Sequence, residues 1–338
     1  MMKKILAGCA ALAFSLPAIG LTTTAQAEEA AKEVTVYSGR GEALVSPIIA
    51  EFERASGIKV NVRFGGTSEL AALLTEEGDQ SPADVFWAQD GGAVGAISAL
   101  FADLPAEINE GVSAEFRNNN NKWAPTSGRS RTLVYSTERV TDADMPATIA
   151  DLTNEKYKGR VAWAPTNGSF QAFVTAFRVA HGDEATKEWL EGMIANGAKA
   201  YRNNGTQIEA IADGEVDFGL VNNYYLGRYI ARDAKYPVAQ THFAAGDIGN
   251  LLNVAGAGVV AVSDNQENAR KFIEYLLSPA AQQYITTQGN EYPVIPGLIA
   301  NPTLEPFEKL QEISPKVDIN QISDLDGTLE LLRQVGLL

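Results

Sequence analysis

The sequence predicts an α/β protein made of two lobes that are joined by a hinge. Strand and helix patterns alternate from Val34 to Trp87, and a second α/β unit follows between residues 160 and 221. Two further strand-like segments, 123–135 and 253–262, are suited to crossing between the units. Alternating strands and helices form mostly parallel sheets with helices on their faces. We therefore expect mixed, mostly parallel sheets flanked by helices, with a cleft at the hinge.

The first unit has clear start and stop signals. Ser46 is expected to cap a helix with Pro47 at its first position, and Gly57 is expected to end it. The polar or small segments 38–42, 65–68 and 89–92 follow the expected strands 34–37, 58–64 and 83–87, and a helix is expected at 69–77. Ligands of parallel sheets bind beyond the carboxyl ends of the strands. These segments are therefore expected to line one edge of the cleft.

The second unit repeats the pattern. Its expected strands are 160–163, 200–203 and 217–221, and its expected helices are 170–179, 184–196 and 205–213. The Gly-rich segment 253–262 can bend as it crosses back to the first unit. Helices are then expected at 265–277, 278–288 and 326–338.

The N-terminus predicts export. Lys3 and Lys4 precede an apolar stretch from Ile5 to Leu21, and Ala25-Gln26-Ala27 is a typical cleavage site. Cleavage after Ala27 would remove residues 1–27, including Cys9, which is the single cysteine of the chain. The mature protein would then have neither a disulfide nor a thiolate site.

The charge excludes other classes of protein. Without the signal peptide Lys plus Arg falls from 27 to 25 while Asp plus Glu stays at 42, which leaves a net charge of −17. So acidic a chain is a poor binder of nucleic acid or anionic membrane. No second stretch is apolar enough to span a bilayer, so no membrane insertion is expected.

Two adjacent tyrosines are the main candidate site. Tyr224 and Tyr225 follow the mostly apolar run 216–221 and the amides Asn222 and Asn223. Phenolate is a hard oxygen donor that suits a highly charged cation, and a bound cation lowers the pKa of its ligands. One hypothesis is a site for ferric iron. The alternative is that the two rings pack and their hydroxyls form hydrogen bonds.

Six segments together resemble a known family, the periplasmic ferric-ion-binding proteins, which are the substrate-binding components of iron(III) ABC importers and are type II periplasmic binding proteins. The segments are 37–40, 81–87, 127–131, 165–169, 222–225, and 278–279 with 291–293. The resemblance covers nearly the whole mature chain. It implies a periplasmic monomer that delivers iron to an inner-membrane ABC permease. The expected lobes are 28–128 with 255–305, and 129–254 with 306–338.

The family's iron ligands are only partly present. The resemblance implies that Tyr224 and Tyr225 bind Fe³⁺ as phenolates. The His and Glu that many members add correspond here to Gly41 and Gln89, and a third tyrosine of one subgroup corresponds to Phe170. Two phenolates leave Fe³⁺ with a net charge of +1. The resemblance therefore implies a synergistic anion, carbonate or phosphate.

Several residues are candidates for holding that anion. Arg40 can grip it in a bidentate fork. The backbone amides of Asn167, Gly168 and Ser169, at a helix start, suit an anion. Asn204 and Asn222 match positions that line the anion pocket in the family.

Other charged residues near the strand ends have two interpretations. Glu42 and Asp90 could replace the missing metal ligands, or they could simply start helices. Arg129 and Arg131 are expected to form ion pairs between the lobes or to carry charge on a strand face.

Three other classes of protein compete with an iron carrier as an interpretation of the sequence. An enzyme is not expected, because His181 and His242 have no nearby nucleophile or metal-ligand spacing. A structural exported protein does not need polar strand ends. The serious alternative is a binding protein for a small oxyanion or phosphonate without iron, which the same arginine and amides would serve. In the expected mechanism, iron and the anion dock on the tyrosine lobe and Arg40 closes over them from the other lobe.

Overall fold

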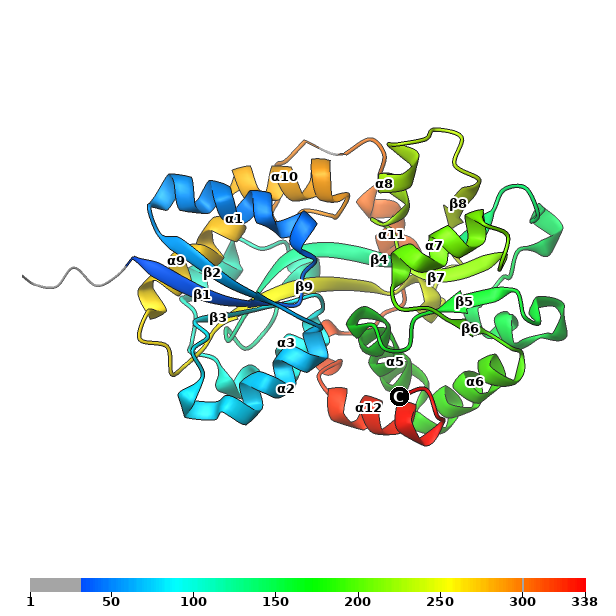
Figure 1. Ribbon diagram of the computed structural model, residues 1–338, viewed down its shortest axis with the longest axis horizontal. Coiled ribbons are helices and arrows are strands. Elements are labelled where there is room, and N and C mark those ends of the chain that lie inside the picture. The colour runs from blue at the N-terminus through cyan, green and yellow to red at the C-terminus, as the bar shows by residue number, and fades with distance from the viewer. Residues whose placement is uncertain (1–31, 300) are drawn as a thin grey trace, which may run out of the picture. The chain divides into compact units, whose positions relative to one another are not determined.

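The structure is a computed structural model that describes residues 32–299 and 301–338. Within this part, the strands form one sheet in the order β2-β1-β3-β9-β4-β7-β5-β6, with β8 paired to β4 outside this path (Figure 1). The predicted signal peptide and its cleavage after Ala27 lie outside the described residues. The strands are β1 Glu33–Ser38, β2 Lys59–Phe64, β3 Val85–Ala88, β4 Ala124–Ser136, β5 Val161–Trp163, β6 Lys199–Ala200, β7 Phe218–Asn222, β8 Val238–Thr241 and β9 Leu252–Val259.

The sheet has a parallel block at each end and antiparallel strands between them. β1 pairs in parallel with β2 and β3, and β5 pairs in parallel with β6 and β7. β4 is antiparallel to β9 at residues 124–130 and to β7 at residues 131–135. β4 therefore runs from one block to the other, with β9 beside it in Figure 1. This mixed α/β architecture confirms the predicted fold class.

Helices cover both blocks of the sheet. We call the part built on β1, β2 and β3 the first lobe and the part built on β5, β6 and β7 the second lobe. The α-helices are α1 Glu42–Ser56, α2 Thr67–Glu77, α3 Gly91–Ala96, α4 Ala106–Glu110, α5 Gly168–His181, α6 Asp183–Ala195, α7 Asn204–Ala212, α8 Leu226–Ile230, α9 Gln266–Leu276, α10 Pro279–Gly289, α11 Phe307–Ile313 and α12 Leu325–Gln334. None of these helices has the length and apolar character needed to cross a bilayer.

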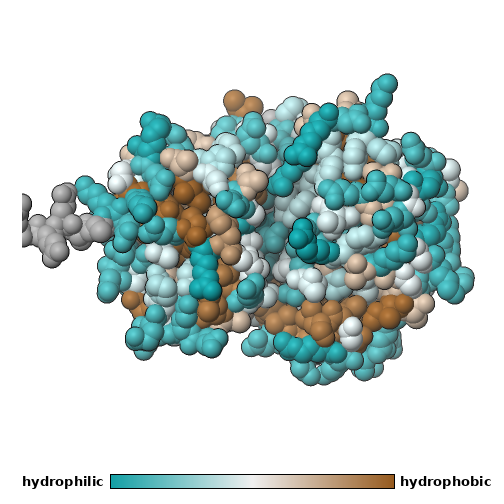
Figure 2. All heavy atoms as spheres, in the orientation of Figure 1, coloured by the Kyte–Doolittle hydropathy of each residue, from teal (hydrophilic) through white to brown (hydrophobic). Residues whose placement is uncertain are grey.

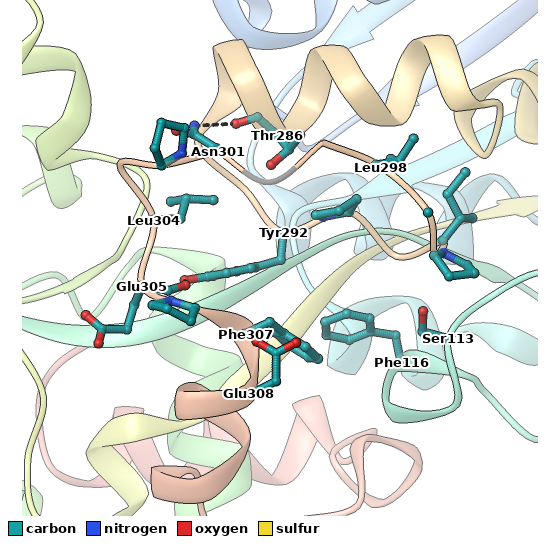
Figure 3. A pocket seen from close by; sticks show the side chains of 16 residues that line it. Ser113, Phe116, Thr286, Tyr292, Leu298, Asn301, Leu304, Glu305, Phe307 and Glu308 are labelled. Carbon is teal, nitrogen blue, oxygen red and sulfur yellow. Dashed lines mark hydrogen bonds between the residues drawn. The ribbon is translucent and has the colours of Figure 1, made fainter.

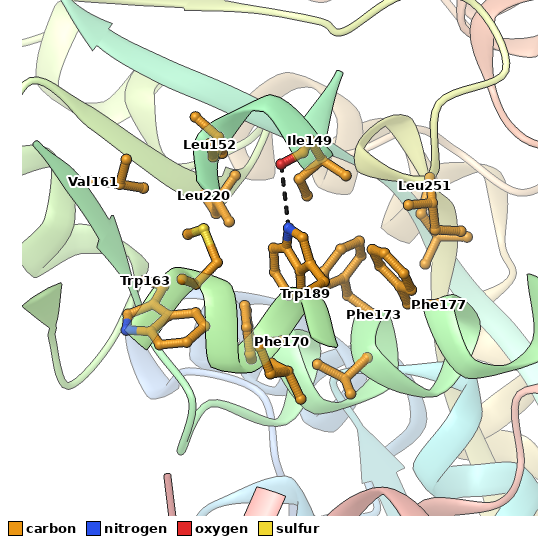
Figure 4. Packing of buried hydrophobic residues seen from close by; sticks show 14 of the residues in the cluster. Ile149, Leu152, Val161, Trp163, Phe170, Phe173, Phe177, Trp189, Leu220 and Leu251 are labelled. Carbon is orange, nitrogen blue, oxygen red and sulfur yellow. Dashed lines mark hydrogen bonds between the residues drawn. The ribbon is translucent and has the colours of Figure 1, made fainter. Parts of the chain in front are cut away.

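Each lobe has an aromatic core. In the first lobe Phe272 meets the edges of Phe52 and Trp87, at ring-centroid distances of 5.1 and 5.8 Å. In the second lobe Trp189 packs against Phe173 and Phe177, and its Nε1 donates to the carbonyl oxygen of Ile149 at 3.2 Å (Figure 4). Figure 2 shows a largely hydrophilic face with two hydrophobic areas, one over the first lobe and one low on the second lobe near α12.

Two predicted helix boundaries were wrong. α1 begins at Glu42 after Gly41, so Pro47 lies inside the helix rather than at its first position. The turn is closed by Leu44 and Val45, whose amides both donate to the carbonyl of Gly41, and this local bonding outweighs the missing N–H of proline. The last helix ends at Gln334 and not at residue 338, because Gly336 adopts a positive φ of 78°.

The segment after α10 lies against the first lobe. Phe307 of α11 packs on Phe116 and Tyr292, at centroid distances of 5.0 and 5.5 Å. This contact ties the start of the expected 306–338 segment to first-lobe residues. The exact lobe boundaries remain a prediction.

Candidate functional site between the lobes

The two tyrosines lie side by side in the turn between β7 and α8. Their rings stack at a centroid distance of 4.5 Å and an interplanar angle of 29°. Tyr224 is buried and Tyr225 is partly exposed. Burial, and next the neighbouring Tyr224, raise the pKa of Tyr225 well above its usual value. The pair is therefore packed as the second interpretation expected, and both phenol oxygens also reach the same neighbour.

That neighbour is Gln89, which follows β3 of the first lobe. Its Nε2 lies 3.1 Å from the phenol oxygen of Tyr224 and 3.5 Å from that of Tyr225. A side-chain amide nitrogen can only donate a hydrogen bond, so it holds both phenol oxygens as acceptors. The first lobe therefore contributes a hydrogen-bond donor at the position where a carboxylate was expected in relatives.

Arg40 is buried beside the tyrosines, but it already has a partner. Its Nη2 lies 2.6 Å from Oε1 of Glu291, and both side chains are almost fully buried. Burial lowers the pKa of Arg40, but Glu291 and the two tyrosines outweigh it and raise the pKa. Burial raises the pKa of Glu291, and Arg40 and Arg129 hold it below its usual value. Glu291 was not predicted as a site residue.

Arg129 is the least expected feature of the site. It is 1% exposed, and none of its three guanidinium nitrogens has a hydrogen-bond acceptor within the described part of the chain. Its Cζ lies 6.0 Å from the ring centroid of Tyr224. Burial lowers its pKa, whereas the nearby Glu291 raises it. The expected interlobe ion pair is not formed among the described residues, because β4 carries Arg129 into the interior, where its charge lies on a buried strand face.

Arg131, two residues along β4, is also buried without an ion pair among the described residues. Its Nη1 donates to Oδ1 of Asn222 at 3.3 Å, and its Nη2 donates to the carbonyl of Leu220 at 3.0 Å. Burial lowers its pKa to about 10. Arg131 therefore ties β4 to β7, the strand that carries the tyrosines.

The turn before α5 contacts the end of β7, next to the tyrosines. Oδ1 of Asn167 accepts from the amide and the hydroxyl of Ser169, at 3.2 and 2.7 Å. Nδ2 of Asn222 in turn donates to that hydroxyl oxygen at 3.1 Å. The amide of Asn167 donates to the carbonyl of Ala164. Two of the three amides that were expected to bind an anion are therefore already engaged.

Gly168 brings this turn against the first lobe. A Cβ atom on Gly168 would lie 3.2 Å from Cβ of Thr67 and 3.5 Å from Oδ2 of Asp90. Oγ of Ser68 also donates to Oε1 of Gln171 at 2.6 Å. Asn204 is buried at the start of α7, and its side chain lies close enough to the Tyr225 hydroxyl to lower the pKa of Tyr225. The predicted first-lobe and second-lobe residues therefore meet in one place.

The two candidate carboxylates differ in position. Glu42 is exposed in the first turn of α1. Asp90 is buried and caps α3, with Oδ1 accepting from the amide of Ala93 at 2.8 Å, while Oδ2 has no hydrogen-bond partner among residues 32–299 and 301–338. Burial raises the pKa of Asp90 to about 6. Both carboxylates therefore lie at the start of a helix, which was the second interpretation of these residues.

The space beside Gly41 is open. A Cβ atom there would meet no heavy atom within 4 Å. The described residues contain no cluster of three His, Cys, Asp or Glu side chains that could hold a metal ion. A metal at this site would therefore depend on the phenol oxygens.

Sequence and structure comparisons place the chain among iron-binding proteins. Residues 47–311 match the family of bacterial extracellular solute-binding proteins. The chain is 34% identical over 334 residues to the major ferric iron-binding protein of Neisseria meningitidis, covering 96% of this chain and 98% of the relative. It is 33% identical to the Fe(3+)-binding periplasmic protein of Serratia marcescens, over the full length of both. The crystal structure of iron-bound HitA from Pseudomonas aeruginosa superposes with a TM-score of 0.85 at 34% identity, covering 90% of this chain and 99% of that chain.

Proposed function

This chain belongs to the bacterial extracellular solute-binding proteins, and we propose that it captures Fe³⁺ between its lobes for an ABC importer. The named relatives bind ferric iron and cover the chain almost end to end. In this proposal the protein works in the periplasm as a monomer after cleavage behind Ala27. It then docks on an inner-membrane permease. The relatives are named for binding ferric iron, and this chain has a pair of tyrosines that can bind it. Both observations favour Fe³⁺ as the ligand over an oxyanion without iron.

The observation that carries the proposal is the position of the two phenols. Tyr224 and Tyr225 present adjacent oxygens to one first-lobe side chain, Gln89, at the boundary of the lobes. Phenolate oxygens are hard donors that match the charge of Fe³⁺. A bound cation would itself lower the pKa of the Tyr225 phenol, which burial now raises. We therefore assign Tyr224 and Tyr225 as the iron ligands.

The same region suits a synergistic anion. Among the described residues, neither the guanidinium nitrogens of Arg129 nor Nε of Arg40 has an acceptor. A buried donor without an acceptor is costly, and a carbonate or phosphate would satisfy several at once. It would also balance the +1 charge that two phenolates leave on Fe³⁺. We propose that Arg129 and Arg40 hold this anion, with Asn204, Asn222 and the 167–169 turn around it.

Closure of the lobes would complete the capture. Contacts such as Ser68 with Gln171 and Gln89 with Tyr224 join the two lobes directly. Excluding water from the site strengthens the attraction between the iron and its anionic ligands. Opening the lobes would break these contacts and expose the iron to the permease.

A colour test examines the proposal. Wild-type protein with Fe³⁺ and bicarbonate is expected to develop a visible phenolate-to-iron charge-transfer band. The double variant Tyr224→Phe/Tyr225→Phe is expected to lose the band. Tyr229→Phe is the matched control, because Tyr229 lies one turn further on and donates to Glu209 at 2.9 Å. A colourless wild type, or a double variant that keeps the band, would refute the iron site.

A further inference from the structure

A second pocket lies behind the tyrosine turn and is bounded by both lobes. It has a volume of about 560 Å³ and is lined by residues of α8 and β8 on one side and by the end of α10 with residues 301–304 on the other. This size is typical of a site for a small organic molecule. Nδ2 of Asn223 donates to the carbonyl of Asn290 at 3.1 Å and joins the two walls.

Arg228 gives this pocket its charge. Among the described residues that line this pocket, Arg228 is the single charged one. Its guanidinium makes no hydrogen bond or ion pair with another described residue, although the chain has a large excess of acids. The other polar groups around the pocket are mainly amides, and the side chains of Gln240 and Gln288 likewise make no hydrogen bond among the described residues. An unpaired cation surrounded by amides is suited to a carboxylate.

A neighbouring pocket differs from the Arg228 pocket in its charge, because it contains no basic residue. It has a volume of about 520 Å³ and shares Asn301 and Leu304 with the pocket behind the tyrosine turn (Figure 3). Its walls are largely apolar, with Phe116, Tyr292 and Phe307, and its charged residues are two acids. An anion would therefore avoid this neighbouring pocket and enter the one that contains Arg228.

We propose that the pocket behind the tyrosine turn binds a small organic carboxylate through Arg228. The carboxylate would pair with the guanidinium, and the remaining polar atoms would meet the amides of Gln240 and Gln288. The apolar body of the ligand would lie against Leu226, Ile230 and Leu304.

Arg228 would also connect this ligand to the iron, a consequence that rests on the proposed function. Its Cζ lies 5.7 Å from the ring centroid of Tyr224 and 5.5 Å from that of Tyr225. A cation this close to the two rings attracts the negative charge that phenolate ligands would carry to iron. A carboxylate that neutralises Arg228 would remove this support. It would therefore weaken the hold on iron, and iron would weaken the carboxylate by the same factor.

The binding test uses the iron-free protein and succinate, which lacks the hydroxyl group of strong ferric chelators. Calorimetry is expected to detect succinate binding that Arg228→Gln weakens by about tenfold or more. Arg232→Gln, an exposed arginine one turn later, is the control and should leave binding unchanged. Ala231→Trp, at an exposed position on the pocket wall, should block it. Arg129→Met should preserve it, since Arg129 faces the iron site.

Three outcomes would overturn the inference. Succinate that fails to bind wild type, or binds Arg228→Gln equally well, removes the pocket assignment. If Arg129→Met loses succinate binding and Arg228→Gln keeps it, succinate binds at the iron site and not in this pocket. For the coupling, succinate should speed the loss of the charge-transfer band to a chelator in wild type but not in Arg228→Gln. Equal rates would disprove the coupling. The calorimetry uses iron-free protein, so it tests succinate binding alone. A failure of the iron proposal would appear only in the colour test.

Discussion

Arg40 and Glu291 are 251 positions apart in the chain and form a buried ion pair, with Nη2 and Oε1 2.6 Å apart. Arg40 follows β1, and Glu291 lies between α10 and Tyr292, whose backbone pairs with Gly128 of β4. The pair therefore connects three segments next to the tyrosines. It also supplies the negative charge that partly balances Arg129.

Removing one member of this pair should destabilise the protein. Glu291→Gln leaves Arg40 and Arg129 buried without a carboxylate, and breaking a buried pair costs about 3–5 kcal/mol. Because glutamine keeps an acceptor oxygen, we expect a loss of about 3 kcal/mol in the free energy of unfolding, measured with urea. Glu51→Gln breaks an exposed pair with Arg54 and should change little. Equal effects of the two variants would contradict this prediction.

Replacing Arg129 should separate stability from function. Burying a guanidinium without acceptors is unfavourable, so Arg129→Met should leave the free energy of unfolding unchanged or raise it by about 1 kcal/mol in anion-free buffer. The same variant should lose the dependence of the iron band on bicarbonate. Urea unfolding and titration of the band with bicarbonate measure the two effects. A strongly destabilised variant whose band still needs bicarbonate would contradict the role proposed for Arg129.

Adding the ligands that this chain lacks should tighten iron binding. The open space beside Gly41 can accept a larger side chain, and glutamate at position 89 has the size of the present glutamine. Gln89→Glu, alone or with Gly41→His, should slow iron loss to a chelator by about tenfold, equivalent to 1.4 kcal/mol. Gln80→Glu adds the same charge at an exposed position away from the tyrosines and is the control. An unchanged rate for both Gln89 variants would show that position 89 does not face the iron.

A pH-dependent stability is expected from Asp217 in the second lobe. Burial raises the pKa of Asp217, but Arg139 and Arg160, at 2.8 and 2.7 Å, together lower it below its usual value. Its folded pKa is therefore lower than the unfolded value of about 3.9. The resulting stabilisation is present above that value and is lost as the pH falls through the folded pKa.

Asp217→Asn should therefore lower the free energy of unfolding by about 1–2 kcal/mol at pH 7. The difference from wild type should shrink as the pH falls below about 4. Thermal unfolding at several pH values measures it. Asp264→Asn, at an exposed position, should show no such trend. A difference that stays constant down to the acid limit would refute the ion-pair explanation.

Local patterns in the sequence predicted much of the fold. The apolar run before Tyr224 and Tyr225 is β7, and the two tyrosines occupy the turn after it as expected. Hydrophobic alternation and helix-stop residues act over a few positions, so they can be seen without a structure. The boundary of α1 was missed because Pro47 is tolerated once the preceding turn is already closed.

The chemistry around the tyrosines depended on contacts between distant residues. The sequence by itself predicted that two phenols follow an apolar strand, and its resemblance to ferric-ion-binding proteins implied missing metal ligands at Gly41 and Gln89. Only the tertiary structure decided that Glu291 pairs with Arg40 and that Arg129 is buried without an acceptor. The physical reason is that burial and ion pairing depend on which segments pack together. That packing is set by β4 and β9 crossing between the lobes, and no short stretch of sequence records it.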